Sequence, residues 1–479
     1  MENNKFNEYV NFLRGALPIG QSFDIGERNS AIGGKEVYFY YVDGFLKSEA
    51  MELIYHTLFM IDKHEMNQRK DAKDFIKHHI PYAQATAETD KEKLMKSLLT
   101  GLILMVIDGF SEVIIMDLRT YPARSVDEPE KEKSLRGAKD GFIETLLFNT
   151  NMIRRRIRDP NLIFEIHTVG TSSRTDVCIG YIKGMVDEKL LKKVQEKIAG
   201  IRQDTLTVGD QSLVEALDRP KWANPLPKVR YTQRPDVVAA HLTEGKLVVL
   251  IDNSPTAVLI PTCVFDFLQD TDDYYFPVMT GNYLRFIRSI NMIAVIFLTP
   301  VYLMMAEGDI PMHPRLEFFF PDEGYSMPLF VQFILLEVAI DGLKLASLST
   351  PSALGMSLSV IGALILGQFA VDSGWFIPQT ILCMAVMALA GFTQPSIELG
   401  YAIKFMRVFI LIGAAILGVW GAAAALVISL IILARTRNIV GDSYLYPLFP
   451  FHWATLKHLL FRTRKREHTE EEDQSGRMR

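Results

Sequence analysis

Residues 334–342 read ILLEVAIDG, and two carboxylates interrupt an otherwise apolar run. Glu337 and Asp341 stand four positions apart, so on a helix they share one face. The residues around them favour a nonpolar environment, and a charge at the centre of a bilayer costs at least ~2.5 kcal/mol on insertion scales. The two carboxylates must therefore face water, protein or another charge, and the flanking sequence indicates which kind of domain contains them.

The residues on either side of this stretch carry very little charge. Only 14 of the 149 residues in 286–434 are Asp, Glu, Lys or Arg, whereas the whole chain of 479 residues has 51 Lys and Arg and 56 Asp and Glu. A soluble domain of that size needs a charged, wetted surface, so the composition predicts an α-helical multi-span membrane domain. Spans of about 20 residues are expected at 286–306, 328–346, 353–371, 376–393 and 408–434.

The N-terminal half predicts a cytoplasmic α/β region of two subdomains. Residues 37–58 and 177–198 each contain a β-rich run, a Tyr-x-x-Gly turn and an amphipathic helix. The glycine ends the strand, and Ser48 or Asp187 supplies a candidate N-cap for the helix. Chance similarity over so short a stretch remains the alternative to an internal repeat.

Composition divides the chain into five parts. Four prolines between residues 218 and 235 indicate a linker, and the polar N-terminus has no apolar run of the kind found in signal peptides. We expect a first cytoplasmic α/β subdomain, a second one, a Pro-rich linker with a juxtamembrane segment, a helical membrane domain and a cytoplasmic C-terminal tail, at 1–120, 121–217, 218–285, 286–434 and 435–479.

Basic residues predict the orientation of the membrane domain. The tail is rich in Lys and Arg, whereas the loop 307–324 is acidic with one Arg, so the tail should be cytoplasmic and the loop outside. Both termini then lie on one side, which requires an even number of crossings. Either 328–346 lies in the membrane plane or is re-entrant, or the long last segment breaks near Gly418 into a hairpin. We favour the first, although it places Lys404 and Arg407 outside.

No pattern in the sequence indicates an enzyme or a bound cofactor. The three cysteines follow no CxxC spacing, and His78 and His79 have no further metal ligand at suitable spacing. The run 154–156, three arginines, ends a helix and is explained by its dipole. The net charge of −5 does not suggest nucleic acid. We therefore expect no catalytic, cofactor or metal site and no nucleic-acid partner.

Two series of small residues predict close helix packing in the membrane domain. Gly355, Ser359, Ala363 and Gly367 recur every four residues, and Gly418 lies in a similar series with Ala414 and Ala422. Such small-xxx-small patterns let helix backbones approach, although membrane helices are rich in Gly and Ala by chance as well. Ser359 and Gln368 additionally offer a polar lining within an uncharged span.

The two carboxylates allow two interpretations. In the first, 328–346 is an interfacial amphipathic helix with an internal ion pair, since Lys344 follows Asp341 by three residues. In the second, the stripe lines a wet path, and several chains around an axis place Glu337 and Asp341 in rings that concentrate cations. The second makes Glu337, Asp341, Ser359 and Gln368 candidate pore or vestibule residues.

Several stretches in order give a family resemblance. Residues 141–157, with Gly141-Phe142, Glu144, Asn149 and IRRRI, resemble the A subunits of the GerA family of spore germination proteins. The family usually has Glu where this chain has Gln233. The resemblance covers roughly residues 20–455 and continues through YTQRPDVVAAHLTEGKLVVLIDNSP (231–255), DDYY (272–275), Arg285, Arg288, SVIGALILGQFAV (359–371) and YLYPLFPF (444–451).

The resemblance implies a function that residue spacing alone does not. It implies a multi-pass protein of the spore inner membrane that forms homo-oligomers, expected to be pentamers, and acts as a channel subunit for monovalent cations during germination. It also implies another membrane protein of the germination apparatus as partner, and no nutrient binding by this chain. The alternative is a non-conducting membrane scaffold that clusters or assists germination receptors. A transporter would require inverted repeats, which are not evident.

Overall fold

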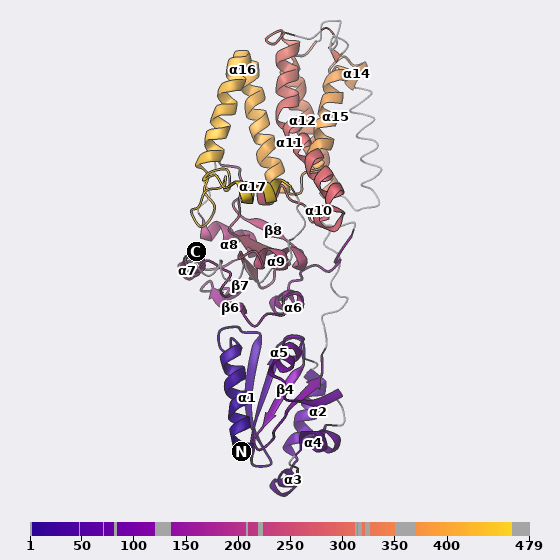
Figure 1. Cartoon of the computed structure of the whole chain (residues 1–479). Coiled ribbons are helices and arrows are strands. Elements are labelled where there is room, and N and C mark those ends of the chain that lie inside the picture. Colours follow the sequence, from indigo (N-terminus) through magenta and orange to yellow (C-terminus); the bar gives the residue numbers. More distant parts are fainter. Residues whose placement is uncertain are drawn as a thin grey trace. The chain divides into compact units, whose positions relative to one another are not determined.

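Figure 1 shows the chain as a computed structural model. The structure describes residues 2–46, 48–69, 71–80, 84–119, 136–206, 209–218, 224–311, 314, 319–320, 326–349 and 370–461. The chain divides into two compact units, Met1–Pro220 with Val229–Thr262 and Lys221–Lys228 with Cys263–Arg479.

The first sheet of the N-terminal unit has five strands in the order β1-β2-β4-β5-β3, and every neighbouring pair is antiparallel. Alternate side chains point to opposite faces of a strand, so Phe39 contributes to one core while Tyr40 contributes to the other. Helices cover both faces. The elements are α1 (Glu2–Ala16), β1 (Ile25–Ile32), β2 (Lys35–Val42), α2 (Ser48–Phe59), α3 (Lys63–Gln68), α4 (Ala72–His79), β3 (Gln84–Glu88), α5 (Lys91–Leu99), β4 (Ile103–Ile107) and β5 (Val113–Asp117).

The second sheet repeats the first in topology. Its order is β6-β7-β9-β10-β8, the same sequence of neighbours with every strand number raised by five. The similar stretches 37–58 and 177–198 are β2–α2 and β7–α7, and their turn glycines, Gly44 and Gly184, both have positive φ values of 78° and 86°. The two similar stretches of sequence therefore belong to two subdomains with the same fold. The elements are α6 (Leu146–Arg156), β6 (Leu162–Val169), β7 (Thr175–Ile182), α7 (Glu188–Ala199), α8 (Gly209–Leu217), β8 (Arg230–Thr232), α9 (Pro235–Leu242), β9 (Leu247–Ile251) and β10 (Ala257–Ile260).

The second sheet corrects one expected boundary. Residues 218–285 were assigned to a linker and a juxtamembrane segment, but β8, β9 and β10 supply three of the five strands of this sheet. The expected linker rested in part on Pro235, but this residue occupies the first turn of α9. A proline is accepted there because the N–H that it lacks would have no partner within the helix. The second α/β subdomain thus extends to about the end of β10 at Ile260.

A buried ion pair joins the two sheets. The guanidinium of Arg154 donates from Nε to Asp24 Oδ2 at 2.8 Å and from Nη2 to Asp24 Oδ1 at 2.9 Å, and both side chains are fully buried. Ser22 Oγ accepts the backbone N–H of Phe164 in β6 at 2.9 Å. The segment that precedes β1 is thereby attached to the second sheet, so Arg154 does more than oppose the dipole of α6.

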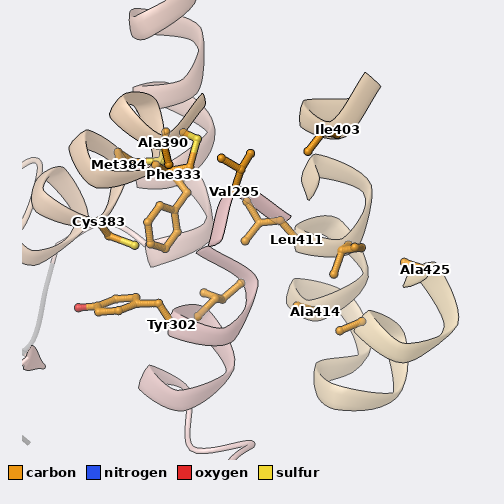
Figure 2. Packing of buried hydrophobic residues seen from close by; sticks show 14 of the residues in the cluster. Val295, Tyr302, Phe333, Cys383, Met384, Ala390, Ile403, Leu411, Ala414 and Ala425 are labelled. Carbon is orange, nitrogen blue, oxygen red and sulfur yellow. The ribbon is translucent and has the colours of Figure 1, made fainter. Parts of the chain in front are cut away.

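The second unit is a bundle of apolar helices. Two described helices, α11 and α16, are long and apolar enough to cross a membrane. Figure 2 shows Phe333 of α12 among the side chains of α11 and α15, and the rings of Tyr302 and Phe333 meet edge to face with centroids 5.8 Å apart. The elements are a 3-10 turn η1 (Val264–Phe267), α10 (Asp272–Tyr275), α11 (Val278–Ala306), α12 (Leu329–Ser349), α14 (Ala370–Asp372), α15 (Pro378–Phe392), α16 (Ile397–Arg435) and α17 (Trp453–Leu460).

Helix α16 is a hairpin of two helical arms. Leu417 and Gly418 depart from helical geometry, and Gly418 has φ = +56°, a conformation that glycine adopts without strain. Gly413 and Gly421 approach closely on either side of the break, and the two arms lie side by side in Figure 1. The last apolar segment thus forms the hairpin that was the second of the two solutions to the crossing count. Helix α12 is one continuous helix of 21 residues.

Candidate functional site: charged side chains between α12 and α16

The carboxylates of α12 meet two cations from α16. Lys404 Nζ lies 3.0 Å from Glu337 Oε1 and also pairs with Asp341 Oδ2. Arg407 Nη2 lies 2.5 Å from Glu337 Oε2. Glu337 and Asp341 share a helical face, as their spacing predicts, and Lys404 bridges them from the opposite helix. The site therefore holds two positive and two negative charges.

Burial makes this pairing necessary. The Arg407 side chain is only 2% exposed and that of Glu337 12%, whereas Asp341 is 31% exposed. An isolated buried charge costs several kcal/mol, and an oppositely charged neighbour with good geometry offsets that cost. Solvent exposure thus increases along α12, from the buried Arg407–Glu337 pair to Asp341 one turn further on.

A buried amide fixes the other end of α12. Gln332 is fully buried, and its Nε2 donates to the carbonyl of Met327 at 2.9 Å. Its Oε1 accepts the backbone N–H of Ile377 at 3.1 Å and the hydroxyl of Thr380 at 2.9 Å, so it caps the start of α15. These bonds fix the position of α12 relative to α15. Gln332 lies about one and a half helical turns before Glu337 on α12.

Sequence reasoning missed Lys404, Arg407 and Gln332. A usable signal existed: Lys404 and Arg407 are three residues apart, so they share a helical face in the same way as the two carboxylates. Lys344 is the partner of Asp341 in the first of the two interpretations given above. Its Nζ lies over the Phe392 ring, 4.9 Å from the centroid, and the bridging cation comes from α16.

A second charged cluster lies at the start of α11. Asp273 is fully buried, and its Oδ2 accepts Arg285 Nε at 3.2 Å and Arg288 Nη1 at 2.9 Å. Arg288 also reaches Asp270, 3.3 Å away. Arg285 donates from Nη1 to the carbonyl of Leu459 in α17 at 3.1 Å. The cluster thus ties the short helix α10 and the C-terminal helix α17 to the base of α11.

Of the remaining predicted site residues, the structure describes only Gly418. Gly418 forms the break of the α16 hairpin and approaches Asp309, which follows α11. The other five lie outside the described residues: Gly355, Ser359, Ala363, Gly367 and Gln368. Within the described part of the chain, no group of three or more His, Cys, Asp or Glu side chains could hold a metal ion.

Comparison with known proteins assigns the family. The model of the Bacillus/Clostridium GerA spore germination protein family matches residues 16–473, nearly the whole chain. The chain belongs to the GerA family. The residues on which the resemblance rests include Arg285, Arg288 and the DDYY stretch, and the structure brings several of them together in the cluster around Asp273.

Several curated GerA relatives match over most of their length. Stage V sporulation protein AF of Bacillus subtilis (strain 168) is 32% identical over 95% of this chain and 92% of that protein. Spore germination protein KA of the same organism is 28% identical over 93% of this chain and 82% of that protein. Spore germination protein A1, also of Bacillus subtilis (strain 168), is 27% identical over 93% of this chain and 92% of that protein. The GerA chain is therefore similar to germination and sporulation proteins over most of its length.

Among solved structures, the N-terminal domain of the A subunit of the Bacillus megaterium spore germinant receptor GerK3 aligns with this GerA chain. The identity is 23%, the alignment covers 52% of this chain and 92% of that domain, and the TM-score is 0.39.

Proposed function

We propose that this GerA-family chain is a membrane subunit of the germination apparatus that acts as a homo-oligomeric channel subunit for monovalent cations in the spore inner membrane. The observation that carries the proposal is the pair of carboxylates, Glu337 and Asp341, on one face of an apolar helix inside the bundle. Carboxylate rings concentrate cations when several chains surround an axis. Membership of a family of germination proteins supplies the biological setting.

The hairpin supports a multi-pass topology with six crossings. These are α11, α12, the charge-free stretch 353–371, α15 and the two arms of α16, with arms at residues 397–416 and 419–435. An even number returns the C-terminal tail to the side of the N-terminal unit, which we assign to the cytoplasm. This solution needs no in-plane helix.

The distribution of charge supports the same orientation. Glu307, Asp309 and Asp372 are the charged residues described at the end where the α16 hairpin turns. The opposite end has Arg285, Arg288 and Arg435, and the basic C-terminal tail follows it. The excess of Lys and Arg marks the cytoplasmic side of a membrane domain. Lys404 and Arg407 then belong to the cytoplasmic half of the bundle.

The described arrangement suits a closed state. Lys404 and Arg407 neutralise both carboxylates within one chain, so the site presents no net charge to a passing cation. In our proposal, conduction requires the first arm of α16 to move relative to α12, which releases Glu337 and Asp341 to line the path. Asp341, the more exposed carboxylate, is released first.

Cation efflux from liposomes tests the proposal. Purified protein is reconstituted with internal potassium, and wild type is compared with Glu337→Gln/Asp341→Asn and with Glu337→Gln/Arg407→Gln, which removes a complete pair. Glu398→Gln, an exposed carboxylate in the first turn of α16, is the matched control. We expect efflux to fall in both double variants and to persist in the control, at unchanged oligomer size.

Two other results would change the assignment. Efflux insensitive to the substitutions keeps a channel and removes Glu337 and Asp341 from its path. The absence of efflux in every sample, also after addition of the partner membrane protein, supports a non-conducting scaffold that clusters or assists germination receptors. The observation that favours this second function is the complete pairing of the four charges, since a scaffold requires a stable bundle and no path.

A further inference from the structure

A row of large apolar side chains is exposed in the segment that follows α16. The segment comprises residues 446–461, which include α17, and we call it the aromatic segment. Its exposed members are Tyr446, Leu448, Phe449, Phe451, Trp453 and Phe461, with exposed fractions between 41% and 73%. Soluble surfaces rarely expose such a contiguous apolar patch unless it binds something.

The aromatic segment is attached firmly to the bundle. Tyr444, two residues before it, is fully buried, and its carbonyl accepts the N–H of Val264 at 3.0 Å. The Tyr444 ring packs on that of Phe267, with centroids 6.3 Å apart. At the other end of the segment, Arg285 Nη1 donates to the Leu459 carbonyl at 3.1 Å. The exposed rings are therefore held outward by an ordered backbone.

The first turns of α11 expose a second apolar group next to it. Met279, Tyr283 and Phe286 are 86%, 61% and 64% exposed. Arg285, between Tyr283 and Phe286, is the residue that contacts the aromatic segment at Leu459. The start of α11, a helix long and apolar enough to cross a membrane, therefore both exposes apolar side chains and contacts the aromatic segment.

The chemistry of both groups matches the boundary of a bilayer. Tyr and Trp carry a polar atom on an apolar ring, and they prefer the headgroup depth of a membrane over either water or the hydrocarbon core. The sequence after Phe461 adds Arg462, Arg464, Lys465 and Arg466. Each Lys or Arg near an anionic leaflet contributes on the order of 1 kcal/mol of attraction.

We propose that the aromatic segment is an interfacial membrane-binding element, seated in the headgroup layer of the leaflet at the base of α11, and that its chemical partner is anionic phospholipid. The proposal rests on the membrane location given above and is independent of conduction. The Asp273–Arg285–Arg288 cluster acts as the fixed link between this lipid contact and α11.

Fluorescence quenching in the full-length protein tests the proposal. Trp453 is made the sole tryptophan by Trp222→Phe, Trp375→Phe and Trp420→Phe, and the protein is reconstituted into phosphatidylcholine–phosphatidylglycerol vesicles. The lipids carry bromine either near the headgroup or near the bilayer centre. We expect Trp453 emission to be quenched several-fold more by the shallow bromines. If the triple variant aggregates, the difference in quenching between wild type and Trp453→Phe isolates the same signal.

Two outcomes overturn the inference. Trp453 emission that no brominated lipid quenches means that water or protein covers the segment. Quenching that does not change when phosphatidylglycerol is omitted, or when Arg462, Arg464, Lys465 and Arg466 are replaced by Gln, removes the anionic lipid from the proposal. Efflux measured on the same vesicles separates this result from the channel proposal, because lipid contact without efflux leaves the inference intact.

Discussion

Gly413 and Gly421 meet backbone to backbone across the α16 hairpin, and a Cβ added to Gly413 would lie 2.5 Å from the carbonyl oxygen of Gly421. Real Cβ atoms essentially never come so near to an oxygen, so neither position accepts a larger residue without a shift of the two arms. The close approach is a small-residue contact of the kind that lets apolar helices pack without a hydrophobic driving force. It lets the two arms lie close together on either side of the break at Leu417 and Gly418.

Gly421→Ala should therefore destabilise the bundle, by about 1–3 kcal/mol as in other overpacked sites. Gly400→Ala is the matched control, because Gly400 lies in the same helix with nothing within 4 Å of its added Cβ. Alanine is the better helix former by about 1 kcal/mol, so the control should be neutral or stabilising. Thermal unfolding of the detergent-solubilised chain measures both. Equal midpoints for the two variants would contradict the close contact.

The sequence predicted local features well and long-range partners poorly. The repeated strand-turn-helix, the shared face of Glu337 and Asp341, and a possible break near Gly418 all follow from spacing along the chain. The choice of Lys404 as the bridging cation does not, because it depends on how α12 and α16 pack across 63 residues of sequence. Local patterns can narrow the candidate partners of a buried charge, but packing selects among them.

Proline and arginine show the same limit in the N-terminal unit. Pro235 is one of four prolines that suggested a linker, but it lies in the first turn of α9 within the second subdomain. In the sequence, a proline at the first turn of a helix looks the same as a proline in a loop. Arg154 looked like a residue that opposes a helix dipole, yet Asp24, its partner, lies 130 residues earlier. The residues next to Pro235 and Arg154 in the sequence do not show that the first starts a helix of the sheet domain or that the second pairs with Asp24.

The Glu337–Arg407 pair should show strong coupling. Glu337→Met or Arg407→Met alone leaves a buried charge without its full complement, which costs on the order of 3 kcal/mol in buried pairs. Glu337→Met/Arg407→Met removes both charges and should recover most of that loss. Thermal unfolding of the four proteins of this double-mutant cycle measures the coupling. Additive losses would mean that the two side chains do not interact in the folded bundle.

The buried Asp24–Arg154 pair should contribute more to the free energy of unfolding than the exposed Arg14–Glu27 pair of the same unit. Arg154→Met leaves the fully buried Asp24 carboxylate without its guanidinium, so we expect a loss of about 3–5 kcal/mol and separation of the two sheets. Arg14→Met breaks an ion pair with Glu27 in the same unit, but the Arg14 side chain is 47% exposed. That change should cost only about 0–1 kcal/mol. Limited proteolysis between the sheets, with urea unfolding of the full chain, distinguishes the two variants.

The stability of the first sheet should fall on acidification because of His79. Burial lowers the pKa of the imidazole below its usual value, and the nearby carboxylate of Glu65, 3.8 Å away, offsets that effect only in part. The unfolded chain binds a proton near the ordinary pKa of ~6.5, whereas the folded chain resists it. The unfolded state thus holds more protons just below that value, so stability is present above pH ~6.5 and declines as the pH falls.

Replacement of His79 should remove this part of the pH dependence. His79→Gln cannot titrate, so its urea midpoint should change less between neutral and mildly acidic pH than that of wild type. His78→Gln is the matched control, because His78 precedes His79 in α4 and its side chain is 44% exposed. Pulse proteolysis in urea, scored on fragments from the first sheet, reports the unfolded fraction. An acid-dependent loss that persists in His79→Gln but disappears in His78→Gln would assign the effect to the exposed neighbour.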